Sequence, residues 1–299
     1  MRVGQATYNG ASFLAVSSGD DAILPALSDY WDRRFSTCQS IIEAGSDVWR
    51  RLAEFCVAAP PECRVPMRNL RLGAPIPRPH KNIICLGWNY ADHAQESAQA
   101  TGKKVEVPEH PVIFTKAVTA LTGPVDDIEV DSAVTTQLDW EVELGVVIGA
   151  RIKSVDEQAA LDSVFGYTVI NDTSARDLQF RHKQFFVGKS LDRASPMGPW
   201  IVTADEIGDP QQLELRSWVN ETLKQSSSTR HQIFSVAKVI SVLSQVMTLE
   251  PGDIIATGTP SGVGFARTPP EFLTPGDVVE CEIERIGRLR NRIVAARSR

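Results

Sequence analysis

Short apolar runs, several of them alternating with polar residues, recur through most of the chain and predict a mainly β protein with a few helices. These runs lie at 82–87, 142–149, 166–171, 199–204, 213–220, 253–258 and 278–287. Gly, Pro or Asp bounds most of them, as is typical of strands that are joined by tight turns. Residues 249–255 and 273–279 also share the pattern Leu-x-Pro-Gly-Asp followed by two apolar residues, which predicts a Pro-Gly turn that leads into a strand.

Two stretches interrupt the strand pattern and predict helices. In 154–166, Ser154 and Glu157 have the spacing of a capping box, in which a hydroxyl and a carboxylate satisfy free backbone amides at a helix start. In 235–249, apolar residues recur at helical spacing and form one stripe, which we expect to pack against a sheet. The residues of this stripe are Val236, Val239, Ile240, Leu243, Val246 and Met247.

The first 72 residues differ from the rest, because short alternating runs are followed by apolar positions at helical spacing between residues 31 and 56. The segment from Gly73 to Lys81 then contains three prolines, which lack a backbone donor and favour extended geometry in the preceding residue. We therefore predict a small α+β N-terminal domain at 1–72, a linker at 73–80 and a second domain at 81–299.

Composition narrows the class of protein. The 299 residues are 42% hydrophobic and 23% charged, which is ordinary for a globular protein. The net charge of −6 offers no basic surface for nucleic acid, and no stretch approaches the roughly 18 apolar residues of a membrane span. Five scattered cysteines without a CxxC pair argue against a disulfide framework or a zinc site. We expect a cytoplasmic protein with no nucleic-acid or membrane partner.

Three carboxylates form the first candidate site. Glu141 and Glu143 are two residues apart in a predicted strand, so both side chains should lie on one face, roughly 6.6 to 7 Å apart. Asp172 directly follows another predicted strand. Carboxylates without His or Cys favour a hard cation, Mg²⁺, Mn²⁺ or Ca²⁺. The alternative interpretation is an ordinary solvated strand face.

Several polar residues could complete such a site. Arg176, Gln179 and Lys189 are donors that could bind an anionic substrate or an oxyanion, or could form surface ion pairs instead. His93 and Glu96 are three residues apart, so on a helical turn the carboxylate can orient the imidazole as a general base, although helix-surface contacts also have this spacing. The polar segment 98–111 that follows is a candidate mobile lid. Thr259 lies in a predicted loop, 257–264, whose amides could contact a substrate carboxylate.

Taken together, these motifs resemble the fumarylacetoacetate hydrolase family. The resemblance rests on NIICLGWNYADHAQE, PVIFTK, DWEVELGVVIG, GYTVINDTSARDLQ, GKSLD, GPWIV, TGTPSGVG and GDVVECEIERIG, in family order from about residue 81 to the C-terminus. It implies a β-sandwich roll of mixed sheets and a homodimer. It also implies roles for individual residues: Glu141, Glu143 and Asp172 as ligands of Mg²⁺ or Mn²⁺, His93, Glu96 and Lys189 as catalytic residues, and Arg176, Gln179, Thr259 and Tyr90 as substrate-binding residues.

The expected activity is metal-dependent hydrolysis of a carbon–carbon bond in a 1,3-diketo acid of the acylpyruvate, maleylpyruvate or fumarylpyruvate type. The products would be a carboxylic acid and pyruvate or a similar keto acid, in the catabolism of aromatic compounds. Two alternatives remain open: an isomerase, tautomerase or oxaloacetate-type decarboxylase that uses the same metal-enolate site, and a binding protein without activity. Trp88 occupies a position at which relatives vary, and its indole would add apolar surface at the pocket mouth.

Overall fold

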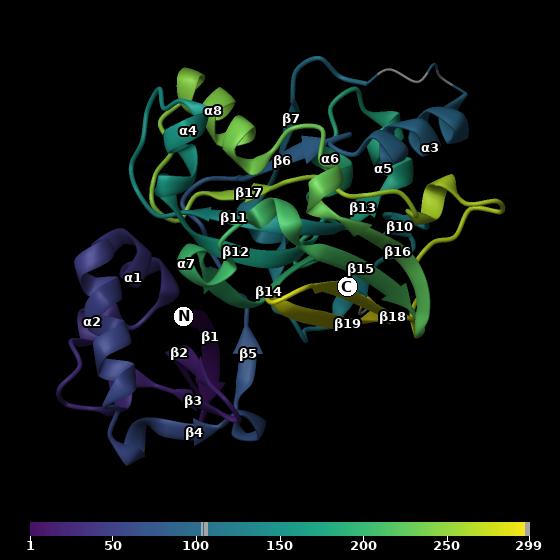
Figure 1. Ribbon diagram of the computed structural model, residues 1–299. Coiled ribbons are helices and arrows are strands. Elements are labelled where there is room, and N and C mark those ends of the chain that lie inside the picture. The colour runs from purple at the N-terminus through teal and green to yellow at the C-terminus, as the bar shows by residue number, and fades with distance from the viewer. Residues whose placement is uncertain (103, 105–106, 297–299) are drawn as a thin grey trace.

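Figure 1 shows the computed structural model, which describes residues 1–102, 104 and 107–296. Strands dominate it, as the apolar runs predict. The strands are β1 (Arg2–Tyr8), β2 (Ala11–Ser18), β3 (Asp21–Ile23), β4 (Arg64–Pro66), β5 (Arg71–Gly73), β6 (Ile83–Gly87), β7 (Val112–Lys116), β8 (Leu121–Thr122), β9 (Ile128–Val130), β10 (Leu138–Asp139), β11 (Val142–Ile148), β12 (Val164–Asn171), β13 (Ser174–Ala175), β14 (Ser195–Thr203), β15 (Glu214–Val219), β16 (Thr222–Ser228), β17 (Ile254–Ala256), β18 (Val278–Ile283) and β19 (Gly287–Ala295). The α-helices are α1 (Cys38–Ala44), α2 (Ser46–Val57), α3 (Ala91–Thr101), α4 (Glu157–Ala160), α5 (Arg176–Arg181), α6 (Phe186–Lys189), α7 (Ala204–Ile207) and α8 (Val236–Val246).

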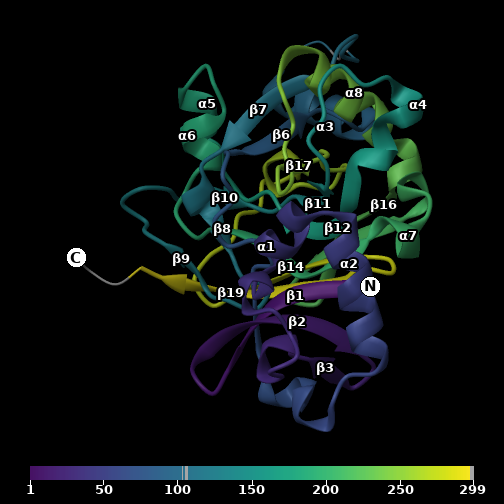
Figure 2. The same cartoon turned by 90° about the vertical axis from the view of Figure 1, so that its left-hand side faces the viewer.

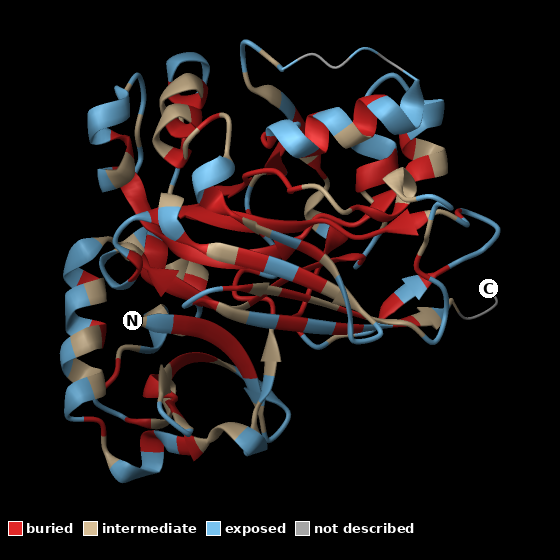
Figure 3. Cartoon of the chain, turned by 45° about the vertical axis from the view of Figure 1, so that its right-hand side comes forward, coloured by how far each residue is buried: buried red, intermediate tan, exposed pale blue. Residues whose placement is uncertain are grey.

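Two mixed sheets pack face to face and enclose the main core. The larger sheet has the strand order β4-β3-β2-β1-β14-β12-β11-β17-β6-β7, with β5 paired to β1 and β8 paired to β14. The smaller sheet has the order β16-β15-β18-β19-β9. Apolar side chains of β11, β12 and β14 share one buried cluster with those of β15, β18 and β19. Strands β11, β12 and β14 are almost continuously buried, whereas buried and more exposed residues alternate along β15, β18 and β19 (Figure 3). The sequence prediction of a mainly β roll of mixed sheets is therefore confirmed.

The N-terminal 73 residues extend the larger sheet. Strand β1 pairs antiparallel with β14, with Val3 opposite Ile201, so the sheet is continuous from the first strand into the rest of the molecule. Helices α1 and α2 lie in front of these strands in Figure 2, and their apolar residues Ile41, Ile42 and Leu52 pack into a second buried cluster. Residues 74–82 form neither helix nor strand. The division into domains at this segment stays a prediction.

The predicted helix at 154–166 is wrong in both its start and its length. Asp156, not Ser154, caps α4, because its carboxylate accepts a hydrogen bond from the Ala159 amide at 2.9 Å. Ser154 has a φ of +54° and lies outside the helix. From Val164 onward the chain is already in β12, where pairing with β11 and β14 uses the backbone groups that a helix would need. Tertiary pairing therefore overrides the local helical pattern.

The second predicted helix is confirmed as α8. Ser235 caps it by accepting from the Lys238 amide, and Val236, Val239, Ile240 and Leu243 are buried as expected. Val246 and Met247 are exposed, against the prediction, because α8 ends at Val246 and the chain leaves the stripe there. No helix in the described part of the chain is both long and apolar enough to cross a bilayer.

We expect Gly166→Ala to destabilise the protein, because Gly166 lies where β12 runs close to β14. A Cβ at this position would collide with the backbone oxygen of Val202, which cannot move without breaking the sheet. The free energy of unfolding should fall by about 1–3 kcal/mol in urea denaturation, the usual cost of overpacking a core. Gly73→Ala is the matched control, since its nearest neighbour, the oxygen of Gln5, would be 3.8 Å away. Equal stability of the two variants would contradict the account.

Candidate active site

The three predicted carboxylates meet where β11 begins and β12 ends. Glu141 immediately precedes β11, Glu143 lies within it, and Asp172 follows β12, with its amide donating to the Glu141 carbonyl at 2.9 Å. One carboxylate oxygen from each residue lies within 4.8 Å of the others. Val142 and Leu144 face the opposite way, into the main core. All three carboxylates are buried, so a solvated strand face is excluded.

Buried cations surround this carboxylate trio. The Lys189 ammonium donates to Glu141 Oε2 at 2.8 Å and to Asp172 Oδ2 at 2.7 Å. Lys116, at the end of β7, donates to Asp172 Oδ1 at 2.5 Å and to the Thr173 carbonyl at 2.9 Å. Sequence reasoning assigned no role to Lys116, although a charged residue that ends an apolar strand was a usable signal. The two lysines relieve much of the repulsion that burial would otherwise impose.

The neighbouring cations do not neutralise the three carboxylates of the trio equally. Burial alone would raise the pKa of Glu141, but Lys189 and Arg176 hold this pKa well below its usual range. For Lys189 the effects have the opposite sign: burial alone would lower its pKa, but the charges of Asp172 and Glu141 raise this pKa above its ordinary value. For Glu143, burial and the charges of Asp172 and Glu141 raise the pKa well above its ordinary value. Among the described residues, Glu141 and Asp172 form ion pairs with cations, and Glu143 is the carboxylate of the trio without one.

The contacts of Glu143 fit a cation. Its Oε2 accepts a hydrogen bond from the Gly258 amide at 2.8 Å, whereas its Oε1 is buried without a hydrogen-bond partner among the described residues. A buried, unpaired carboxylate oxygen is costly unless a positive charge approaches it. Because the donors are all carboxylate oxygens, the trio suits Mg²⁺, Mn²⁺ or Ca²⁺.

Four neighbouring side chains hold the guanidinium of Arg176 in place. Its Nε donates to Asp139 Oδ2 at 2.9 Å, and its NH1 donates to Gln179 Oε1 at 2.9 Å. The guanidinium carbon lies 4.4 Å above the ring of Phe265, and NH2 lies 2.7 Å from Glu141 Oε1. Asp139, which sequence reasoning did not single out, also accepts from the Gly264 and Phe265 amides. Strand β10 thus anchors the guanidinium beside the trio.

The predicted His93–Glu96 pair forms on α3. His93 Nδ1 lies 2.9 Å from Glu96 Oε1, and His93 is buried rather than on an outer helix surface. A carboxylate at Nδ1 favours the tautomer whose Nε2 is free to accept a proton. Glu96 also accepts from the Gly262 amide, at 2.9 Å to Oε2. The pair therefore has the geometry of an oriented general base.

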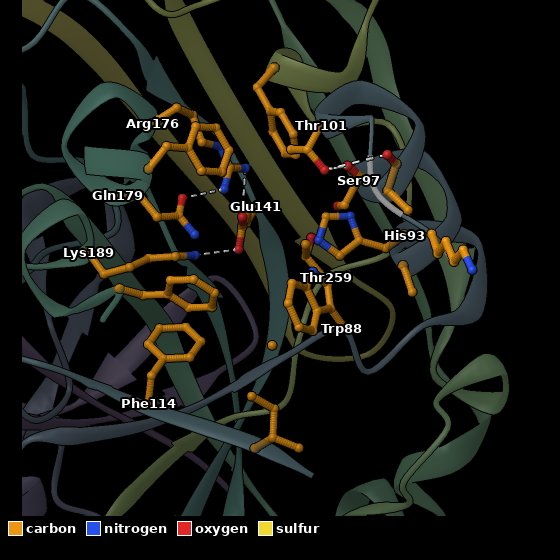
Figure 4. Close-up of a pocket in the computed structure, with 18 residues that line it drawn as sticks. Trp88, His93, Ser97, Thr101, Phe114, Glu141, Arg176, Gln179, Lys189 and Thr259 are labelled. Carbon is orange, nitrogen blue, oxygen red and sulfur yellow. Dashed lines mark hydrogen bonds and ion pairs between the residues drawn. The ribbon is translucent and has the colours of Figure 1, made fainter. Parts of the chain in front are cut away.

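Glu141 of the trio and His93 of the pair line one cavity of about 250 Å³, whereas Glu143, Asp172 and Glu96 are not among the described residues that line it. Figure 4 shows Arg176, Gln179 and Lys189 on one side of Glu141 and His93 on the other. The remaining wall is largely aromatic, from Trp88, Phe114, Phe180, Phe185 and Phe265. Trp88 is partly exposed and packs edge-on against Phe185, in agreement with the apolar surface expected of it. The cavity thus has a charged floor and an apolar rim.

Two predicted substrate-binding residues lie differently from expectation. Thr259 borders the cavity, but its hydroxyl donates to the Val142 carbonyl at 2.9 Å and accepts from Gln225 at 2.8 Å. Tyr90 is fully buried in the main core and is not among the described residues that line the cavity. In the 257–264 loop, the amides of Gly258 and Gly262 bond to protein carboxylates rather than facing an open site.

The predicted lid at 98–111 is only partly described. Residues 98–101 form the last turn of α3, and Lys104 borders the cavity. Residues 103, 105 and 106 lie outside the described residues. Mobility of this segment stays a prediction.

The buried charges and the cavity suit an enzyme that acts on a small anionic molecule. The chain belongs to the fumarylacetoacetate hydrolase family, since residues 82–294 match the family model described as fumarylacetoacetate (FAA) hydrolase C-terminal. This match confirms the family resemblance of the sequence motifs.

Individual relatives are similar over most of the chain. Oxaloacetate tautomerase YisK of Bacillus subtilis (strain 168) is 51% identical over 227 residues, which cover 76% of this chain and 74% of that protein. The mitochondrial oxaloacetate tautomerase fahd2 of Xenopus laevis is 45% identical over 228 residues, 76% of this chain and 69% of that protein. A solved fumarylacetoacetate hydrolase from psychrophilic Exiguobacterium antarcticum has 38% identity and a TM-score of 0.84, covering 99% of this chain and 100% of that one.

Glu143→Gln should separate metal binding from folding. The amide keeps the shape and the bond from Gly258 but removes the unpaired charge, so affinity for Mn²⁺, measured by isothermal titration calorimetry, should fall at least about 100-fold. The folded-state pKa of Glu143 lies above its unfolded value, so its ionisation destabilises the metal-free chain. Metal-free wild type should therefore lose stability relative to the variant as pH rises through that pKa.

The control for this prediction is Glu129→Gln, at an exposed position on β9, which should change neither property. Unchanged Mn²⁺ affinity in Glu143→Gln would remove Glu143 from the metal site.

Proposed function

We propose that this protein is a divalent-metal-dependent keto–enol tautomerase that acts on oxaloacetate or a closely similar 2-keto dicarboxylate. One observation carries the proposal: Glu141 and the oriented His93 line the same small cavity, and Glu141 belongs to a buried carboxylate trio in which Glu143 has an oxygen without a partner among the described residues. A tautomerase needs an enolate-stabilising charge and a proton carrier side by side. The printed names of the two curated relatives, both oxaloacetate tautomerases, support this substrate.

Glu141, Glu143 and Asp172 would hold the cation, with Mg²⁺ or Mn²⁺ proposed first and Ca²⁺ as the third candidate. When bound, a divalent cation stabilises the negative charge of an enolate as a Lewis acid. Lys189 and Arg176 add fixed positive charge at the cavity wall. Gln179 accepts from Arg176 through its oxygen, which leaves its amide nitrogen to donate to a substrate carboxylate. These groups bind and orient a dianionic substrate.

His93 would carry the proton. With Nδ1 held by Glu96, its Nε2 takes a proton from C3 of the keto form and leaves an enolate, and the imidazolium returns a proton to the enolate oxygen to give the enol. The reverse sequence converts enol to keto, so the side chain ends each turnover in its starting state. Glu96 stabilises the imidazolium in between, because its carboxylate lies 2.9 Å from Nδ1.

Hydrolysis of a 1,3-diketo acid, the activity expected first from the sequence, is the second candidate. The same His93–Glu96 pair could activate a water, and the similar solved structure is named a hydrolase. The tautomerase is preferred because the curated relatives with higher identity carry that name. A role in aromatic catabolism belongs to the second candidate. The homodimer and the cytoplasmic location also remain proposals, and light scattering would test the first.

The proposal predicts that His93→Ala lowers the rate of enol-to-keto conversion of oxaloacetate by roughly 10²- to 10⁴-fold, the usual contribution of a general acid–base residue. The rate is followed as loss of the enol ultraviolet absorbance after the enol is added in aprotic solvent. Mn²⁺ affinity should not change, because His93 is not in the trio. His231→Ala, an exposed histidine, is the control.

Parallel assays separate the candidate reactions. Pyruvate and carbon dioxide released from oxaloacetate report decarboxylation, and acetate with pyruvate from acetylpyruvate reports hydrolysis. Metal-dependent tautomerisation without either release is the expected result. Faster release of acetate and pyruvate from acetylpyruvate would favour the hydrolase instead, and faster release of carbon dioxide from oxaloacetate would favour a decarboxylase. The absence of metal-dependent turnover in every assay would overturn all three activities.

A further inference from the structure

The position of α3 depends on polar contacts, because the helix buries little apolar surface. Its buried side chains are His93, Ala94, Ser97 and Ala98, of which the two apolar ones are alanines. Burial of alanine methyl groups contributes little free energy compared with Leu or Phe. Yet His93 must face the carboxylate trio from this helix. Something other than a hydrophobic face has to hold it there.

Helix α3 is held in position by residues 257–262 of the TGTPSGVG motif, which we call the 257–262 loop. Gln225 on β16 donates from Nε2 to the Thr259 hydroxyl and to the Pro260 carbonyl, at 2.8 and 2.9 Å. Thr259 in turn donates to the Val142 carbonyl. Gly262 has a φ of +103°, and a side chain there would collide with the Lys224 backbone oxygen. The loop is therefore fixed to β11 and β16 independently of α3.

Among the described residues, two of the loop's groups form hydrogen bonds to α3. The Gly262 amide donates to Glu96, and the Ser261 hydroxyl donates to Asp92 Oδ2 at 2.7 Å. The other oxygen of Asp92 accepts from the His93 amide at 2.8 Å, so this carboxylate joins the first turn of the helix to the loop. Four residues before Gly262, the Gly258 amide holds Glu143. One rigid loop thus sets both the trio and the His93–Glu96 pair.

We propose that Ser261 and Asp92 are positioning residues, a hydrogen-bonded latch that keeps α3 where His93 faces the carboxylate trio. Neither side chain is among the described residues that line the cavity, so neither acts on the substrate directly. Loss of the latch frees the first turn of α3 while the Gly262–Glu96 contact remains. The consequence for turnover rests on the proposed function, whereas the consequence for the helix does not.

The test is hydrogen–deuterium exchange of peptides covering residues 91–101, in full-length protein. Ser261→Ala removes only the hydroxyl, and amide exchange in α3 should rise about 3- to 20-fold, as expected for loss of one partly exposed hydrogen bond to a carboxylate. Asp92→Ala should raise it at least as much, since the bond to the His93 amide is lost as well. The double variant should match Asp92→Ala, and Ser261→Thr should restore slow exchange.

Helix α8 serves as the internal control, because exchange there should not change. With oxaloacetate, Ser261→Ala should lower kcat while KM changes less than twofold, since the substrate contacts are intact. Three results would each overturn the latch. The first is unchanged amide exchange of α3 in Ser261→Ala, and the second is exchange in the double variant that rises by the product of the two single effects. The third is faster exchange in α8 as well as in α3. A latch seen by exchange without any oxaloacetate turnover would instead count against the proposed function.

Discussion

Three carboxylates at the junction of β11 and β12 repel one another in a place from which water is largely excluded. The register that puts Val142 opposite Asn171 brings the backbone positions of Glu141, Glu143 and Asp172 together. Lys116, Lys189 and Arg176 offset most of this repulsion, each from a different element. The negative charge of Glu143 remains uncompensated, and a bound divalent cation would compensate it. Other features of the site follow from this arrangement.

Strand β10 and the 257–262 loop hold the groups that surround the trio in fixed positions. Strand β10 fixes Arg176 through Asp139, and the 257–262 loop fixes both Glu143 and Glu96 through backbone amides. The aromatic residues give the cavity an apolar wall, and a lower local dielectric there would strengthen the charge interactions on the floor. A small dianion held there would meet fixed charges that need little reorganisation, as electrostatic catalysis requires.

Sequence reasoning correctly predicted which side chains lie together where this depends on local spacing. Glu141 and Glu143 share a face because strands alternate, and His93 meets Glu96 because helices repeat every three to four residues. It missed Lys116 and Asp139, whose partners lie 56 and 37 residues away in the chain. Such contacts depend on the strand order of the sheet, which no local pattern encodes. The same limit explains the error in the helix predicted at 154–166, where Val164 pairs with Ile148 of β11 and Gly166 pairs with Thr203 of β14.

The central claim is that the trio binds a divalent cation facing His93. Its most direct test is an anomalous difference map from crystals grown with Mn²⁺ and collected at the manganese absorption edge. The account predicts one strong peak per chain, within about 2.0–2.4 Å of carboxylate oxygens from Glu141, Glu143 and Asp172. The absence of a peak at the trio, or a peak held by other residues of the chain, would contradict it.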